Sequence, residues 1–330
     1  MRYLTFTPLD KSQPPRLGTL YKNDMVIDLA AAKLWAAEMF RQTVSKLPAN
    51  MIAFIQAGSE TWSRTPEIVE ALEDDNPLRL RSPDLFKVGW KITDVTINTP
   101  ILRPPTVRDF YAFETHVAAA QANRGKEVPK EWYQMPVFYF SNPHTIFGPY
   151  ADVPMPQSTQ ALDYELEIAC VIGKAGQDIP AEKAHEHIFG YMLFNDWSAR
   201  DVQAREMSVG LGPAKGKDFA STLGPWIVTP DELADKATDR PGVYDLQMVA
   251  SINGKEYSRG NWKDIYYSFG QMIARASADV PLLPGDVIGS GTVGSGCLLE
   301  LTQGKGPWLQ RGNVVELEVE RLGVIRNRVY

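Results

Sequence analysis

Four carboxylates and one histidine are the residues of this sequence whose types and spacing could do chemistry. They are Asp109, Glu165, Glu167 and Asp196, with His116 following the first of them after seven positions. Carboxylate oxygens are the ligands that hard divalent cations such as Mg²⁺, Mn²⁺ and Ca²⁺ prefer in proteins. A neutral imidazole can take up a proton near neutral pH. These residue types predict a metal-dependent enzyme.

The two glutamates lie in an apolar segment, residues 162–172, that predicts a β-strand. Side chains alternate along a strand, so Asp163, Glu165 and Glu167 would share one face, with the two glutamates about 7 Å apart. Such a pair could bind one ion. Taken alone, the alternation is more typical of a half-buried strand with a solvated acidic face.

The two aspartates have plain structural interpretations as well. Asp196 ends an apolar strand before a helix expected at Ser198–Met207, where it could bind metal or cap the helix. Residues 109–122 predict a helix capped by Asp109. Seven residues are nearly two helical turns, so Asp109 and His116 would project from the same side. Taken alone, this segment is better explained by a helix cap and a surface histidine.

Other motifs are interpreted as structural. His144, His185 and His187 do not follow zinc spacings such as HExxH, and we expect no metal there. The loop Gly212–Phe219 lacks the GxxxxGK[ST] order of a nucleotide site. Lys217 within it could lean on the metal site, because four carboxylates leave about two excess negative charges around a divalent cation.

The elements that must position these residues begin with a small unit that ends at about residue 100. Pro100, Pro104 and Pro105 predict a rigid, extended connector at that boundary. Within the unit, alternation and helical periodicity predict strands at 2–7, 17–21 and 24–28 and helices at Leu29–Phe40 and Pro66–Asp75.

Strands dominate the remainder, residues 101–330. The apolar segments expected to build it lie at 162–172, 188–195, 244–252, 286–292, 297–302 and 313–319. Glycine and proline turns separate them, which predicts a mixed, mainly antiparallel sheet and an α+β fold that is mainly β. The polar, irregular stretch 124–136 predicts a mobile lid.

The composition excludes several classes of protein. The net charge of −6, spread over 330 residues, argues against nucleic acid or an anionic membrane surface as partner. No apolar run reaches the length of a membrane span, and Met1–Phe6 does not open an export signal. Cys170 and Cys297 are the two cysteines, too few for a disulfide framework. We expect a cytoplasmic enzyme.

Taken together, these segments resemble the fumarylacetoacetate hydrolase family over residues 100–330. The most specific stretch is Ala184–Gly190 followed by Asn195–Gln203, with Leu282–Asp286 and Ser290–Thr292 further on. The resemblance implies the family's mixed β-sandwich roll as a catalytic domain at 101–330, with a small N-terminal β domain at 1–100. It also implies a homodimer.

By position, the resemblance makes the four carboxylates the ligands of one divalent cation per subunit, with Mg²⁺ expected and Mn²⁺ or Ca²⁺ as alternatives. His116 takes the place of the general base, oriented by Glu300. Arg124, Lys217 and Gln203 would steady negative charge that develops during the reaction. The positions matched to substrate are Tyr111, Arg124, Tyr139, Gln203, Met207 and Thr292.

The resemblance implies hydrolysis of a carbon–carbon bond in an anionic 1,3-diketo acid, fumarylacetoacetate-like or acylpyruvate-like, in the breakdown of aromatic compounds. Met207 stands where the family has a substrate-contacting tyrosine, and no His-Gly-Arg follows Tyr139, as in the shorter bacterial members. The substrate therefore stays open. The first alternative is a metal-dependent 2-keto acid lyase, a decarboxylase or dehydratase, and the second is a non-catalytic binding protein.

Overall fold

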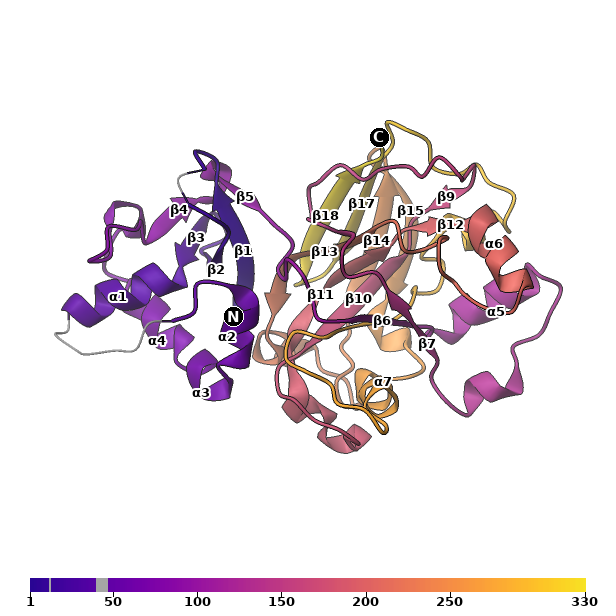
Figure 1. The fold of residues 1–330 in the computed structure, drawn as a ribbon, viewed down its shortest axis with the longest axis horizontal. Coiled ribbons are helices and arrows are strands. Elements are labelled where there is room, and N and C mark those ends of the chain that lie inside the picture. The colour runs from indigo at the N-terminus through magenta and orange to yellow at the C-terminus, as the bar shows by residue number, and fades with distance from the viewer. Residues whose placement is uncertain (12, 40–46) are drawn as a thin grey trace.

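The computed structural model describes residues 1–11, 13–39 and 47–330 of the chain. Its N-terminal part contains short strands and four helices (Figure 1). These are β1 (Arg2–Pro8), β2 (Arg16–Tyr21), β3 (Met25–Asp28), α1 (Leu29–Met39), α2 (Met51–Gln56), α3 (Ser59–Trp62), α4 (Thr65–Glu70), β4 (Gly89–Lys91) and β5 (Val95–Ile97). The predicted strands and first helix are present, and Phe40 lies outside the described residues.

The larger part is built mostly of strands. They are β6 (Val107–Phe110), β7 (Phe138–Ser141), β8 (Ile146–Phe147), β9 (Leu162–Asp163), β10 (Leu166–Ile172), β11 (Ile188–Asp196), β12 (Ser198–Ala199), β13 (Ser221–Val228), β14 (Gln247–Ile252), β15 (Lys255–Asn261), β16 (Val287–Gly289), β17 (Val314–Val319) and β18 (Gly323–Arg328). The helices are α5 (Glu114–Ala122), α6 (Arg200–Ser208), α7 (Phe269–Ala276) and α8 (Leu298–Leu301). Short 3₁₀ turns lie at Pro77–Arg79, Ile92–Asp94, Lys130–Tyr133, Ala181–His187, Pro230–Lys236 and Trp262–Asp264.

One large mixed sheet runs through the molecule in the order β4-β3-β2-β1-β13-β11-β10-β16-β6-β7. Strand β16 pairs with β6 in parallel, whereas β10 pairs antiparallel with both β11 and β16. A second, antiparallel sheet has the order β15-β14-β17-β18. The predicted class, an α+β fold that is mainly β, is confirmed.

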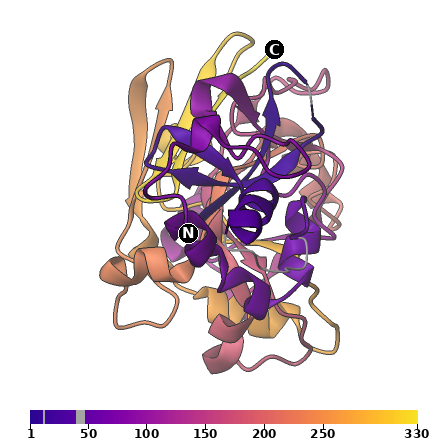
Figure 2. The same ribbon diagram turned by 90° about the vertical axis from the view of Figure 1, so that its left-hand side faces the viewer.

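The large sheet continues across the expected boundary at residue 100. Strand β1 pairs with β13, with Tyr3 opposite Ile227, and the N-terminal helices cover the neighbouring part of the sheet (Figure 2). Tyr3 and Phe54 pack with Phe189 of β11 in one buried cluster. The division into 1–100 and 101–330 stays a prediction.

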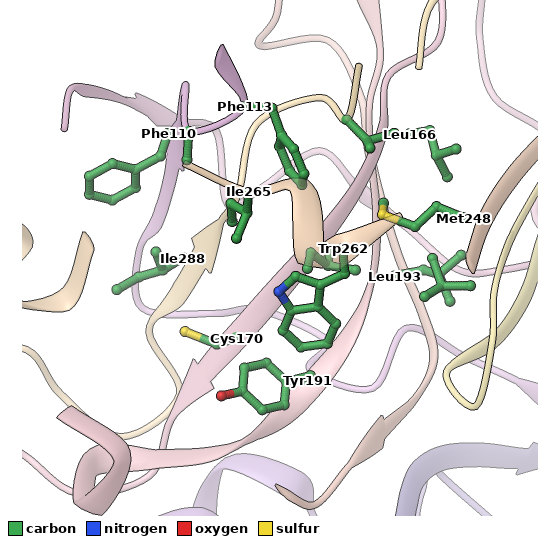
Figure 3. Close-up of a cluster of buried hydrophobic side chains, with 14 of the residues drawn as sticks. Phe110, Phe113, Leu166, Cys170, Tyr191, Leu193, Met248, Trp262, Ile265 and Ile288 are labelled. Atoms are coloured by element: carbon green, nitrogen blue, oxygen red, sulfur yellow. The ribbon is translucent and has the colours of Figure 1, made fainter. Parts of the chain in front are cut away.

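The main core fills the space between the two sheets. Trp262 packs against Tyr191 with ring centroids 4.9 Å apart, and Cys170 and Leu193 lie beside them (Figure 3). Since the N-terminal cluster covers the opposite face of β10, every residue from 162 to 172 is buried. A solvated acidic face on this strand is therefore wrong.

Residues 109–122 do not form one helix, and that prediction is wrong. Asp109 lies on strand β6, and α5 begins only at Glu114. Strand β6 is buried along its length and pairs with β16 on one side and β7 on the other. These pairings with distant segments override the local helical pattern.

The predicted lid is anchored at Trp132 and at Tyr133, whose hydroxyl donates to Glu114 Oε1 at 2.7 Å. Trp132 is buried, and its Nε1 donates to the Tyr111 carbonyl at 2.8 Å, whereas residues 122–127 are exposed.

In the described part of the chain, no helix combines the length and apolar character that a membrane span requires.

Candidate active site

The four candidate carboxylates lie close together on strands β6, β10 and β11 of the large sheet and on the break before β10. Asp109 lies on β6 and Glu167 on β10. Asp196 ends β11, and Glu165 lies in the break between β9 and β10. Oxygen atoms of all four lie within 4.8 Å of one another. Strand β16 runs between β10 and β6, and a Cβ added to its Gly289 would lie 2.5 Å from Asp109 Oδ1, so only glycine leaves room for that carboxylate.

The turn after β16 supplies hydrogen bonds to two of these carboxylates. The Gly291 N–H donates to Asp109 Oδ1 at 3.2 Å and to Glu167 Oε2 at 3.1 Å. The Thr292 hydroxyl donates to Glu167 Oε1 at 3.3 Å. Gly291 has a φ of +76°, and a Cβ there would lie 2.5 Å from the Phe110 carbonyl oxygen. A side chain at this position would displace the turn from the carboxylates.

Lys217 and Tyr139 contact the other two carboxylates. Lys217 Nζ donates to Asp196 Oδ2 at 2.6 Å and also to Glu165 Oε2. The Tyr139 hydroxyl donates to Asp196 Oδ2. The expectation that Lys217 would lean on the acidic cluster is met in the structure.

Burial and mutual repulsion make the cluster unfavourable as four free charges. Burial, together with Asp196 beside Asp109 and Asp109 beside Glu167, raises the pKa of both Asp109 and Glu167 well above the ordinary range. Burial would raise the pKa of Glu165 as well, but the Lys217 and Arg200 charges outweigh it and lower that pKa. Asp109 and Glu167 thus lack enough nearby positive charge to stabilise their ionised forms.

The donor set fits a hard divalent cation. Asp196 Oδ1 is buried and has no hydrogen-bond partner among the described residues. Such an orphaned oxygen is costly unless a partner from outside the chain satisfies it. Asp109, Glu165, Glu167 and Asp196 would hold the ion through carboxylate oxygens, as Mg²⁺, Mn²⁺ and Ca²⁺ require.

His116 and Glu300 form a pair beside the cluster. His116 Nδ1 lies 2.5 Å from Glu300 Oε1, and its Nε2 lies 4.0 Å from Glu165 Oε1. Glu300 Oε2 accepts the Ser295 N–H at 2.9 Å, which fixes the carboxylate. The pair joins α5 to α8, which are far apart in the sequence. One imidazole nitrogen is thus held, and the other faces the carboxylates.

A cavity of about 300 Å³ opens over this arrangement. All six positions that the resemblance matched to substrate line it, together with His116 and Lys217. Its remaining lining includes Ala120, Val137, Phe138, Pro213 and Leu299, which are apolar, and Arg200. Glu300 lies behind His116 and does not line the cavity.

Arg200 is the functional candidate that sequence reasoning missed. It is buried, and its Nη2 lies 2.8 Å from Glu165 Oε1. Its Nη1 donates to Gln203 Oε1 at 3.2 Å, and its Nε donates to Asp163 Oδ2 at 2.8 Å. Lys217 offsets only one of the about two excess negative charges expected around a divalent cation. A second cationic side chain was therefore to be expected, and Arg200, four residues after Asp196, was a candidate in the sequence.

His185 and His187 lie apart from the site. His185 and His187 belong to the 3₁₀ turn Ala181–His187, and their Nδ1 atoms contact backbone carbonyls of Glu182 and Lys174.

The chain is similar to known proteins over most of its length. Residues 106–330 match the family model described as fumarylacetoacetate (FAA) hydrolase C-terminal. The fumarylacetoacetase of Oryza sativa is 30% identical, over 88% of this chain and 79% of the relative. The human mitochondrial oxaloacetate tautomerase is 33% identical, over 86% and 80%. The solved fumarylacetoacetate hydrolase from Exiguobacterium antarcticum is 25% identical, with a TM-score of 0.70 over 100% of this chain and 99% of that one.

A model match over more than half of the chain, and relatives that it covers for most of their length, establish the relationship. The chain belongs to the fumarylacetoacetate hydrolase family.

Proposed function

We propose that the protein is a divalent-cation-dependent hydrolase that cleaves a carbon–carbon bond in an acylpyruvate-like 1,3-diketo acid. The observation that carries the proposal is His116, which lines the cavity beside the four clustered carboxylates and is held from behind by Glu300. A base beside a cation site is what the attack of water on a polarised carbonyl requires.

When bound, a cation such as Mg²⁺ supplies polarisation of a keto or enolate oxygen of the substrate. His116 Nδ1 faces a Glu300 oxygen. A carboxylate can only accept there, so this contact selects the tautomer with the proton on Nδ1 and leaves Nε2 as the free base. His116 Nε2 removes a proton from water as the oxygen adds to the carbonyl carbon. The bond to the neighbouring carbon then breaks, and the electron pair leaves on an enolate. The histidinium returns its proton to that fragment.

Three cationic or polar side chains would stabilise the negative charge of this reaction. Lys217 and Arg200 are buried at the cluster, and Gln203 lines the cavity beside them. Preorganised donors in a site that excludes water stabilise developing charge strongly. Arg124 is exposed at the cavity and could meet a second anionic group of the substrate.

The apolar part of the cavity lining favours a substrate with an apolar acyl group. Met207, which is 40% exposed, lines the cavity, as do Val137 and Leu299. A thioether offers no hydrogen-bond donor to a carboxylate at this end. We therefore propose that acylpyruvates are preferred over fumarylacetoacetate.

The second candidate is enol–keto isomerisation of a 2-keto acid, which the similarity to an oxaloacetate tautomerase favours. Isomerisation moves a proton and needs no water nucleophile. Assays with Mg²⁺ or Mn²⁺ would use acetylpyruvate, fumarylacetoacetate and oxaloacetate, with product analysis. Release of acetate and pyruvate from acetylpyruvate supports the hydrolase. Conversion of oxaloacetate enol to ketone alone supports the tautomerase, and carbon dioxide would indicate a lyase.

A further inference from the structure

We propose that Asp163, which does not line the cavity, is a positioning residue that couples the His116–Glu300 pair to Arg200. The carboxylate of Asp163 is fully buried, with 0% exposure, yet it lies apart from the four clustered carboxylates. The proposal rests on the proposed function only for its activity assay.

Each oxygen of Asp163 accepts two hydrogen bonds. Oδ1 accepts the Tyr164 N–H at 2.9 Å and the Leu298 N–H at 2.8 Å. Oδ2 accepts the Leu299 N–H at 2.9 Å and Arg200 Nε at 2.8 Å. All four hydrogen bonds to this carboxylate come from the protein itself. Its partners therefore identify the parts of the structure that it positions.

The first of these partners is α8, the helix that carries Glu300. It has only four residues, and its N-cap, Cys297, makes no side-chain hydrogen bond to it. The first N–H groups of a helix have no partner within the helix. Two of these N–H groups, those of Leu298 and Leu299, donate to Asp163 on the distant strand β9. These bonds fix where α8 begins. Glu300 lies in the same helical turn, and its contact with His116 depends on that placement.

The second partner is the guanidinium group of Arg200. A guanidinium is planar, and its nitrogens point in fixed directions. With Nε held on Asp163, Nη1 reaches Gln203 and Nη2 reaches Glu165. Without Asp163, the group is free to turn about its stem and present both Nη atoms to Glu165. The position of Gln203 in the cavity would then change with it.

A purely structural role predicts a different outcome from a positioning role, and the protein contains a matched control. Asp28 is also fully buried, pairs with Arg16 and accepts the Ala31 N–H at the start of α1, but lies in the N-terminal part. Asp163→Asn and Asp28→Asn therefore remove the same kind of charge from the same kind of environment. We expect both to lower the melting temperature, and only Asp163→Asn to lower kcat, by about 10- to 100-fold as for outer-shell residues of metal sites.

Double-mutant cycles identify the route. If Asp163 acts through Glu300 and Arg200, Asp163→Asn should cost far less in the background of Glu300→Gln or Arg200→Lys than in the wild type. Asp28→Asn should have no effect on kcat in any background. Losses in kcat that multiply independently in both cycles would overturn the proposal.

A spectroscopic measurement tests the same coupling without substrate. The His116 Nδ1 proton, observed by NMR in protein labelled with ¹⁵N-histidine, reports the contact with Glu300. Asp163→Asn should displace or broaden this signal, and Asp28→Asn should leave it unchanged. An unchanged signal in folded Asp163→Asn protein would overturn the proposal even if acetylpyruvate proves not to be a substrate. If that variant does not fold, Asp163→Glu, which keeps the charge on a longer side chain, takes its place with the same criterion.

Discussion

Replacing Lys217 by methionine should move cation affinity and activity in opposite directions. Lys217 Nζ is buried and donates to Asp196 Oδ2 at 2.6 Å and to Glu165. Burial would lower the pKa of Lys217, but Asp196 and Glu165 outweigh it and raise that pKa, so the ammonium is charged. Methionine keeps most of the apolar stem and removes one positive charge from the cluster.

The magnitude follows from the buried contacts. Removing one partner of a buried ion pair costs about 3–5 kcal/mol of folding stability, because the remaining charge is left uncompensated. A bound divalent cation would compensate that charge, and its affinity should rise by at least about tenfold, or about 1.4 kcal/mol. Saturating cation then stabilises the variant more than the wild type, since ligand binding adds to stability in proportion to the logarithm of affinity. Hydrolysis should nevertheless fall, because a donor to developing negative charge is lost.

Denaturant unfolding with and without Mn²⁺, and calorimetric titration of Mn²⁺, measure both effects. The control is Lys215→Met, because Lys215 is exposed and pairs only at the surface with Asp218, at 2.8 Å. It should leave stability and Mn²⁺ affinity within the error of the measurement. Weaker Mn²⁺ binding in Lys217→Met would refute the reasoning that these carboxylates share one cation and that Lys217 competes with it.

Four further expectations follow from the site and its surroundings. His116→Ala should keep Mn²⁺ affinity but lose about 10²–10⁴ of the hydrolytic rate, the usual contribution of a general base; near-normal hydrolysis would remove His116 from the mechanism. Met207→Tyr should raise the ratio of kcat/KM for fumarylacetoacetate to kcat/KM for acetylpyruvate by about 10- to 100-fold, because a hydrogen bond to a charged carboxylate is worth about 1.5–3 kcal/mol, and an unchanged ratio would count against a contact between Met207 and that end of the substrate. Glu206 accepts the N–H groups of residues 214–216, which outweigh the effect of burial and lower its pKa from 4.5. The hydrogen bonds from residues 214–216 to Glu206 are therefore complete above about pH 4.5 and are lost as the pH falls through the lowered pKa. The amide NMR shifts of 214–216 should be constant from about pH 5 to 8, and movement near pH 6 would contradict this. Light scattering at micromolar concentration should give the mass of a homodimer, and a monomer mass would contradict that expectation.

The alternation of side chains along a single segment predicted the relative placement of two candidate ligands. The alternation around Glu165 and Glu167 correctly placed both side chains on one side of the chain, and their oxygens meet in the cluster. Burial of that side could not be predicted from the strand, because the groups packed on it come from the N-terminal part and from the turn after β16.

Local pattern failed where distant strands decide the structure. Asp109 was expected on a helix, but pairing with β16 and β7 draws it into the sheet. Arg200 was missed because its two acidic partners, Asp163 and Glu165, precede it by more than thirty residues. Contacts of this kind are set by topology, which no window of sequence contains.

The pairing of β1 with β13 has a practical consequence for expressing this protein. Removing residues 1–100 would leave β13 as a bare edge where Tyr3 had been paired with Ile227. It would also uncover Phe189 and Met192, which pack in the cluster shared with the N-terminal helices. An unpaired strand edge beside an exposed apolar face is a template for intermolecular pairing. A truncated chain that begins near residue 101 should therefore aggregate, although it contains every residue of the site.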